Sequence, residues 1–137
     1  MAKTFTLEVI TPDRKVLSDG EITSVVLPGV EGYLGALAHH EPLMTSLAIG
    51  ELDYHRADGH VDAMAVTGGF VEIFDNKITV LADTAELREE IDLPRAEDSV
   101  RRAEERLSSR PDDMDLERAQ ISLKRALNRL SVAGKQF

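Results

Sequence analysis

Residues 67–107, TGGFVEIFDNKITVLADTAELREEIDLPRAEDSVRRAEERL, contain the change of pattern that decides the fold. Strand-like runs at 70–74 and 78–81 surround a turn signal at Asp75-Asn76. After about residue 84 the apolar residues recur every three or four positions, which is the spacing of one face of an α-helix. This change predicts a β-domain followed by a helical one.

The residues before this stretch predict further short strands. Runs of strand-like residues occur at 5–9, 22–27, 33–37, 43–47, 51–54 and 63–67, separated by turn residues such as Pro28-Gly29 and Asp58-Gly59. Gly68-Gly69 indicates a tight turn or a bulge between two of the strands. Together these runs predict an antiparallel β-sandwich, with a barrel as the alternative, over residues 1–86.

Residues 87–137 have the pattern of an antiparallel hairpin of two helices. Asp92 is a good N-cap, and Pro94 is tolerated in a first helical turn. The two apolar stripes consist of Leu93, Ala96, Val100, Ala103 and Leu107, and of Leu116, Ala119, Leu123, Ala126, Leu130 and Ala133. Because these stripes are rich in alanine, little apolar area joins the helices, and we expect the hairpin to open readily.

The composition excludes several classes of protein. The chain has 137 residues and no cysteine, which rules out disulfides and thiolate metal sites. It shows no apolar leader and no apolar run long enough to cross a membrane, so we expect neither a signal peptide nor a membrane span. The net charge of -9 argues against nucleic acid as the main partner.

The charges are distributed unevenly along the chain. Residues 1–91 hold 16 acidic and 6 basic side chains, whereas residues 116–137 hold 1 acidic and 5 basic ones. The basic segment is either a solvated helix face or a surface for an acidic partner.

No catalytic residues are expected. The sequence has no nucleophile elbow and no glycine-rich phosphate loop, and its carboxylates are scattered. His39 and His40 are adjacent, and neighbouring residues of a strand point to opposite faces, so we expect no metal site there.

Three arginines of the predicted hairpin are candidate binding residues. Arg95 lies in the first turn of a helix, where the helix dipole disfavours a cation. Arg125 and Arg129 are four residues apart and repel each other on one helix face unless an anion bridges them. An antiparallel hairpin can bring all three together near Asp92 and Glu86, which would suit a polyphosphate. The alternative is that Asp92 only caps its helix and that the arginines form surface ion pairs.

Four stretches of the chain resemble bacterial ATP synthase epsilon subunits. They are LGALAHHEPLMTSL (34–47), TGGFVEIFDNKITVLADTAE (67–86), IDLPRA (91–96) and SLKRALNRLSVA (122–133), in the family's order and spacing. The resemblance implies a non-catalytic subunit whose sandwich binds the gamma subunit and rests on the c-ring, peripherally at the cytoplasmic face of the bacterial cell membrane. It also implies that the helices either fold against the sandwich or extend along gamma toward the alpha/beta hexamer, where they inhibit ATP hydrolysis.

The resemblance further implies that ATP is a regulatory ligand. Some bacterial members bind ATP through a pattern Ile/Leu-Asp-x-x-Arg-Ala, which Ile91, Asp92, Arg95 and Ala96 match. No other cofactor is implied. ATP would stabilise the folded, non-inhibitory hairpin.

Three more residues match the nucleotide site of these relatives. Arg125 and Arg129 match arginines that contact phosphates, and Glu86 matches an acidic residue beside the nucleotide. In the extended state the basic tail would reach acidic loops of the beta subunits. The alternatives are a constitutive adaptor whose hairpin binds no nucleotide, and a stand-alone sandwich enzyme or ligand-binding module, which no residue supports.

Residues 32–43 depart from the family pattern G-E-L-G-I-L-P-G-H-x-P-L. Tyr33 stands where relatives have an acid, and Ala38-His39 stands where they have Pro-Gly, while His40 matches their histidine. We expect this departure to alter the details of the ring contact and to leave the fold unchanged.

Overall fold

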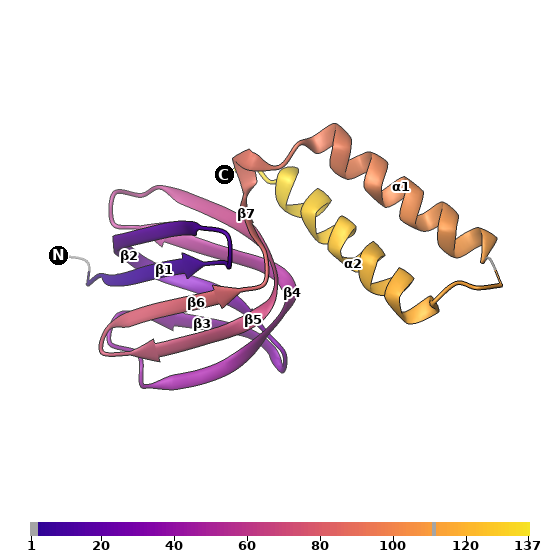
Figure 1. Cartoon of the computed structure of the whole chain (residues 1–137). Coiled ribbons are helices and arrows are strands. Elements are labelled where there is room, and N and C mark those ends of the chain that lie inside the picture. The colour runs from indigo at the N-terminus through magenta and orange to yellow at the C-terminus, as the bar shows by residue number, and fades with distance from the viewer. Residues whose placement is uncertain (1–2, 111) are drawn as a thin grey trace.

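A computed structural model describes residues 3–110 and 112–137 as a β-domain followed by a helical hairpin (Figure 1). The elements in chain order are β1 (Phe5–Ile10), β2 (Lys15–Gly29), β3 (Gly32–Leu37), β4 (Leu43–Arg56), β5 (Val61–Phe74), β6 (Lys77–Ala82), β7 (Ala85–Leu87), the 3₁₀ helix η1 (Arg88–Glu90), α1 (Leu93–Ser109) and α2 (Leu116–Ala133). The expected order of a β-sandwich and two helices is therefore confirmed.

The strands form one sheet that closes on itself. Their order is β1-β6-β5-β4-β2-β3, with β7 on β5, and an additional pairing of β1 with β2 completes the ring. β1 runs parallel to β6, whereas its pairing with β2 and the other strand pairings are antiparallel. The sandwich is thus a flattened barrel and includes one parallel pair. Alternation within a strand shows which face is buried but does not show which strand lies beside it.

The interior of the barrel is filled by large apolar side chains. In β1 the inward residues alternate with outward ones, as the sequence predicted. The largest fully buried side chains are Leu7, Ile22, Leu27, Leu52, Met64, Ile73, Ile78, Val9, Val25, Val66, Val71 and Val80. Each contributes about 1.5–3 kcal/mol of transfer free energy to folding.

The Gly68-Gly69 pair lies inside one continuous strand and does not separate two strands. β5 keeps an unbroken register with β4, from Leu43 opposite Ile73 to His55 opposite Val61. Both glycines have positive φ, +74° and +110°. A Cβ atom on Gly69 would collide with the backbone of Leu81 and Ala82. The pair is therefore neither a turn nor a register shift, and it permits close approach of two bent backbones.

Other turn predictions differ in outcome. Asp75 and Asn76 have φ values of 50° and 59° and form the predicted turn between β5 and β6. Pro28-Gly29 does not end its strand early, because β2 continues to Gly29 and Pro28 pairs with Tyr33. His39 has a φ of 63°, and its N–H donates to Asn76 Oδ1 at 2.8 Å.

Each helix begins after an aspartate N-cap, and the one at Asp92 was predicted from the sequence. Asp92 Oδ1 accepts from the Arg95 N–H, and Asp115 Oδ1 accepts from the Arg118 N–H, each at 3.1 Å. Pro94 occupies the first turn of α1, where no backbone hydrogen bond is lost.

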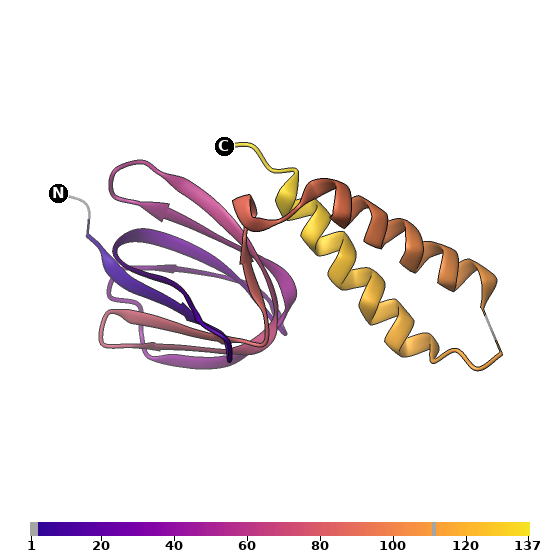
Figure 2. The same ribbon diagram turned by 45° about the horizontal axis from the view of Figure 1, so that its top comes forward.

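The hairpin projects from one end of the barrel, and α2 is the helix that lies against the sheet (Figures 1 and 2). Its joint with the barrel is a small apolar cluster of Ala63, Ala65, Ile91, Ala96 and Val132. Most of these side chains are small, so the joint buries little apolar area.

Candidate functional site

An ion pair joins the β-domain to α2 at the base of the hairpin. The Glu86 carboxylate, on β7, accepts from Arg129 Nε at 2.7 Å and from Arg129 Nη2 at 3.1 Å. The exposed fractions of these side chains are 33% and 28%. Two parallel hydrogen bonds between a guanidinium and a carboxylate form a strong and directional contact. Two of the predicted site residues therefore meet.

The predicted motif 91–96 forms the start of α1, and its residues have different environments. Ile91 and Ala96 are 7% and 1% exposed and belong to the joint cluster. Asp92 uses Oδ1 to cap the helix, and no partner of its Oδ2 is found within the described residues. The Arg95 side chain is exposed and has no hydrogen bond or ion pair within residues 3–110 and 112–137.

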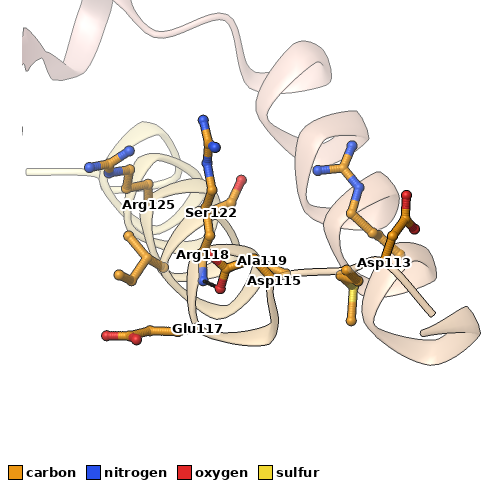
Figure 3. Close-up of a pocket in the computed structure, with 10 residues that line it drawn as sticks. Asp113, Asp115, Glu117, Arg118, Ala119, Ser122 and Arg125 are labelled. Carbon is orange, nitrogen blue, oxygen red and sulfur yellow. Dashed lines mark hydrogen bonds between the residues drawn. The ribbon is translucent and has the colours of Figure 1, made fainter. Parts of the chain in front are cut away.

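Arg125 lies farther from the base than the other predicted residues. It lines an open groove of about 830 Å³ between the helices, together with Arg106 and Arg118. Figure 3 shows Arg118 and Arg125 on the same side of α2, while Glu117 points elsewhere. The predicted set is thus distributed over the Glu86–Arg129 pair, the start of α1, and this groove.

Sequence reasoning missed Arg118 and Arg106 as members of the groove. Arg118 precedes Arg125 by seven positions and so shares its helix face, and this spacing could have identified it. Arg106 belongs to α1, and its approach to α2 depends on how the two helices pack. The groove also contains Asp113 and Asp115, so its charge is mixed.

A second set of polar contacts joins α2 and the residues after it to β4. Asn128 Nδ2 donates to the Gly50 carbonyl at 2.8 Å. Lys135 Nζ pairs with the Glu51 carboxylate and lies 3.5 Å from Asp53 Oδ2. Burial, assisted by a hydrogen bond with Asp53, raises the pKa of Glu51, although the Lys135 ammonium opposes this shift. The hydrogen bond to Glu51 raises the pKa of Lys135.

Buried and paired charges also surround η1, between the two domains. Asp62 is 4% exposed and accepts from Arg88 Nε at 2.9 Å. Burial, followed by the nearby Asp62 charge, raises the pKa of Tyr54 to about 12. Arg14 Nη2 donates to Glu90 at 2.8 Å and thereby lowers the pKa of that carboxyl.

Several large apolar side chains of the β-domain are exposed, and two groups of them are relevant here. The first consists of Met44, Phe70 and Leu81, which line a shallow hollow of about 320 Å³ across β4, β5 and β6. The second consists of Tyr33 and Leu37 of β3, each 66% exposed. Exposed apolar patches of this kind are typical of protein interfaces.

The described part of the chain contains neither a helix suited to span a membrane nor a group of residues suited to hold a metal ion. None of its helices has the length and apolar character needed to span a membrane. Within the same residues, no three His, Asp or Glu side chains are grouped in a way that would hold a metal ion.

Comparison with known families identifies the chain. Residues 4–88 match the family model described as ATP synthase, Delta/Epsilon chain, beta-sandwich domain, and residues 89–134 match the corresponding long alpha-helix domain. The chain belongs to the ATP synthase delta/epsilon chain family. The resemblance expected from the sequence is confirmed, and the chain is a non-catalytic epsilon subunit of the ATP synthase central stalk.

Individual relatives agree with this family. The ATP synthase epsilon chain of Pelotomaculum thermopropionicum is 52% identical over 108 residues, which cover 79% of each chain. That of Symbiobacterium thermophilum is 52% identical over 104 residues, covering 76% of this chain and 74% of the relative.

Solved structures show the same arrangement of domains. A chain of the Euglena gracilis mitochondrial ATP synthase, OSCP/F1/c-ring in rotational state 1, is 25% identical with a TM-score of 0.77, covering 88% of this chain and 76% of that chain. A chain of the Tetrahymena thermophila mitochondrial ATP synthase central stalk/c-ring is 17% identical with a TM-score of 0.61, covering 96% of this chain and 94% of that chain.

Proposed function

We propose that this epsilon subunit is an ATP-sensitive brake of the rotor. ATP bound at the base of the hairpin holds it folded, and loss of ATP lets it extend along gamma and inhibit hydrolysis by the alpha/beta hexamer. The observation that carries the proposal is the Glu86–Arg129 ion pair, which joins the two domains inside the predicted nucleotide site. A polyphosphate can replace one carboxylate as the partner of that guanidinium.

The surrounding side chains complete such a site. Arg125 precedes Arg129 by four residues, a rise of about 6 Å along the helix, which a triphosphate can span. Arg95 adds a guanidinium without a partner among the described residues. Once Arg129 turns to phosphate, the Glu86 carboxylate is free to accept from a ribose hydroxyl or the adenine amino group.

The energy scale is adequate for a switch. Ligand at one hundred times its dissociation constant stabilises the state that binds it by about 2.7 kcal/mol. The hairpin joint is built mainly from alanines and surface ion pairs. A contribution of this size is therefore enough to invert a marginal equilibrium between folded and extended forms.

Isothermal titration of the full chain with ATP tests the site. We expect binding to the parent chain and its loss in Asp92→Ala/Arg95→Ala. The matched control is Arg101→Ala, which removes an exposed α1 arginine that pairs with Asp98. Absence of binding by the folded parent at millimolar ATP would refute the nucleotide site.

The inhibitory half of the proposal needs the assembled complex. In Arg125→Ala/Arg129→Ala we expect weaker ATP binding together with weaker inhibition of ATP hydrolysis, because the same cations would face phosphate in one state and beta-subunit carboxylates in the other. Retention of both properties in this variant would contradict the proposal.

A constitutive adaptor that binds no nucleotide is the second candidate. It is favoured by the Glu86 carboxylate, which already neutralises Arg129, and by the position of Arg125 in a separate groove. The titration with ATP separates the two candidates, because only the brake binds nucleotide at physiological concentration.

For assembly, we propose that the β-domain joins gamma to the c-ring at the cytoplasmic face of the membrane. The β3 patch with Tyr33 and Leu37 is the segment that the resemblance places on the ring, which leaves the patch around Phe70 for gamma. Phe70→Glu should weaken binding to purified gamma, whereas Leu37→Glu should weaken retention on c-ring-containing membranes. If each variant bound both partners normally, the assignment of patches would be wrong.

A further inference from the structure

The folded hairpin is held to the β-domain by two separate groups of polar contacts. One is the Glu86–Arg129 pair, on β7. The other lies on β4, where Asn128 binds the Gly50 carbonyl and Lys135 meets Glu51 and Asp53. Only the first group belongs to the predicted nucleotide site.

We propose that Lys135, inserted between Glu51 and Asp53, is a second lock of the folded hairpin that works without nucleotide. Glu51 and Asp53 are two residues apart on one strand, so their side chains lie on the same face of the sheet. Two neighbouring carboxylates repel each other unless a cation lies between them. Lys135 supplies that cation from the residues that follow α2.

The environment strengthens this contact beyond an ordinary surface pair. The Glu51 and Asp53 side chains are 13% and 30% exposed, so solvent screens their charges incompletely. Asp53 Oδ1 is buried and has no hydrogen-bond partner among the described atoms. In the closed state Lys135 therefore neutralises two neighbouring carboxylates that are only partly hydrated.

The position of Lys135 makes it sensitive to movement of the helix. It directly follows Gly134, the C-cap of α2, and its N–H donates to the Val132 carbonyl at 3.1 Å. A rotation of α2 away from the sheet therefore withdraws Lys135. Phe137 reinforces the closed position, because its ring lies 5.5 Å from the Arg88 guanidinium and 5.9 Å from Lys135 Nζ.

The contact between Lys135 and the two carboxylates determines how much free energy ATP binding must add to keep the hairpin folded. With Lys135 in place, part of the folded population persists when nucleotide is absent, so ATP has to add only the remaining stabilisation. This regulatory role rests on the proposed movement of the hairpin, whereas the contact itself does not depend on nucleotide.

Hydrogen exchange of the full chain without nucleotide tests the lock. We expect Lys135→Gln to increase exchange of the α2 amides by about five-fold, the equilibrium effect of one ion pair of about 1 kcal/mol. Lys135→Glu should increase it further, because it adds a third carboxylate. The matched control is Lys124→Glu, which makes the same charge change at an exposed α2 position without an ion pair in the described structure.

A charge exchange separates the lock from a general loss of helix stability. Glu51→Lys/Lys135→Glu should restore much of the protection that Lys135→Glu removes. Exchange in Lys135→Glu equal to that of the Lys124→Glu control would overturn the proposal.

Distance measurements and ATP titration make the two proposals distinguishable. Because the chain contains no cysteine, spin labels at Glu21→Cys and Glu105→Cys report hairpin position directly. Opening in Lys135→Glu, in a chain that binds no ATP, would retain the lock and reject the nucleotide site. If the chain bound ATP and the hairpin did not move in Lys135→Glu, the nucleotide site would be retained and the lock rejected.

Discussion

The β-domain and the hairpin are stabilised by different kinds of contact. All of the largest fully buried side chains lie in the β-domain, whereas the buried residues of the helices are alanines and the valines at 100 and 132. The hairpin is joined to the barrel by a small apolar cluster, by ion pairs and by one amide hydrogen bond. Exposing buried apolar area to water costs free energy in any rearrangement, whereas an ion pair can exchange one charged partner for another. The proposed switch requires this difference, because in that proposal the β-domain stays folded while the hairpin moves.

The largest expected effect comes from shortening one buried side chain in each region. Leu52→Ala should lower the free energy of unfolding of the whole β-domain by about 2–5 kcal/mol, since it leaves a cavity in the barrel. Val100→Ala should cost about 1–2 kcal/mol, confined to the helices. Urea denaturation reports the first effect and hydrogen exchange of the helices the second. Equal shifts of the global midpoint would mean that the two regions unfold as one unit.

A smaller effect is expected in alkali, in the β-domain. Tyr54 has a pKa of about 12 in the folded chain against an ordinary value of 10.0, so folding favours its neutral form. This stabilisation is complete below pH 10 and is lost as pH rises toward 12, at a total cost of about 2–3 kcal/mol. Denaturation at several pH values should show this loss in the parent and not in Tyr54→Phe.

The exposed tyrosine at position 33 provides a matched control. Tyr33→Phe also removes one hydroxyl but leaves Tyr54 in place, so the alkaline loss of stability should persist. Equal alkaline sensitivity in Tyr54→Phe and the parent would exclude Tyr54 as the cause.

Removing a helix cap tests whether a helix can be destabilised without an effect on the β-domain. Asp92→Ala removes the side-chain acceptor of the Arg95 N–H and should destabilise α1 by about 1 kcal/mol. Asp115→Ala should do the same to α2. Exchange of the first-turn amides should rise in each variant while the β-domain amides stay protected. Loss of protection in the β-domain would show that the hairpin and the β-domain do not unfold independently.

The smallest expected effect concerns the contact between Arg14 and Glu90. The hydrogen bond from Arg14 lowers the pKa of Glu90 below 4.5, so its stabilisation is present above that pH and is lost as pH falls through the lowered pKa. Because both side chains are partly exposed, the effect should stay below about 1 kcal/mol. Glu90→Gln should flatten the acid limb of the stability curve slightly, and an unchanged limb would contradict the assignment.

The nucleotide-site prediction shows where local patterns stop being informative. Spacing placed Arg125 and Arg129 on one helix face, and the structure agrees. The predicted hairpin brought Arg129 near Glu86, 43 residues away, and did not indicate that Arg125 would instead line a groove with Arg106. Such pairings depend on the angle at which the hairpin leaves the barrel, and no local periodicity encodes that angle.

The sequence by itself determined the change from strands to helices, the cap at Asp92, the turn at Asp75-Asn76 and the family. These features depend on local propensity, on hydrogen bonds within four residues and on stretches of sequence that resemble a known family. Tertiary structure decided that β1 runs parallel to β6, that β5 passes unbroken through Gly68-Gly69, and that Lys135 reaches β4. Each of these joins segments far apart in the chain, and the packing of the whole molecule selects among partners that local sequence leaves equivalent.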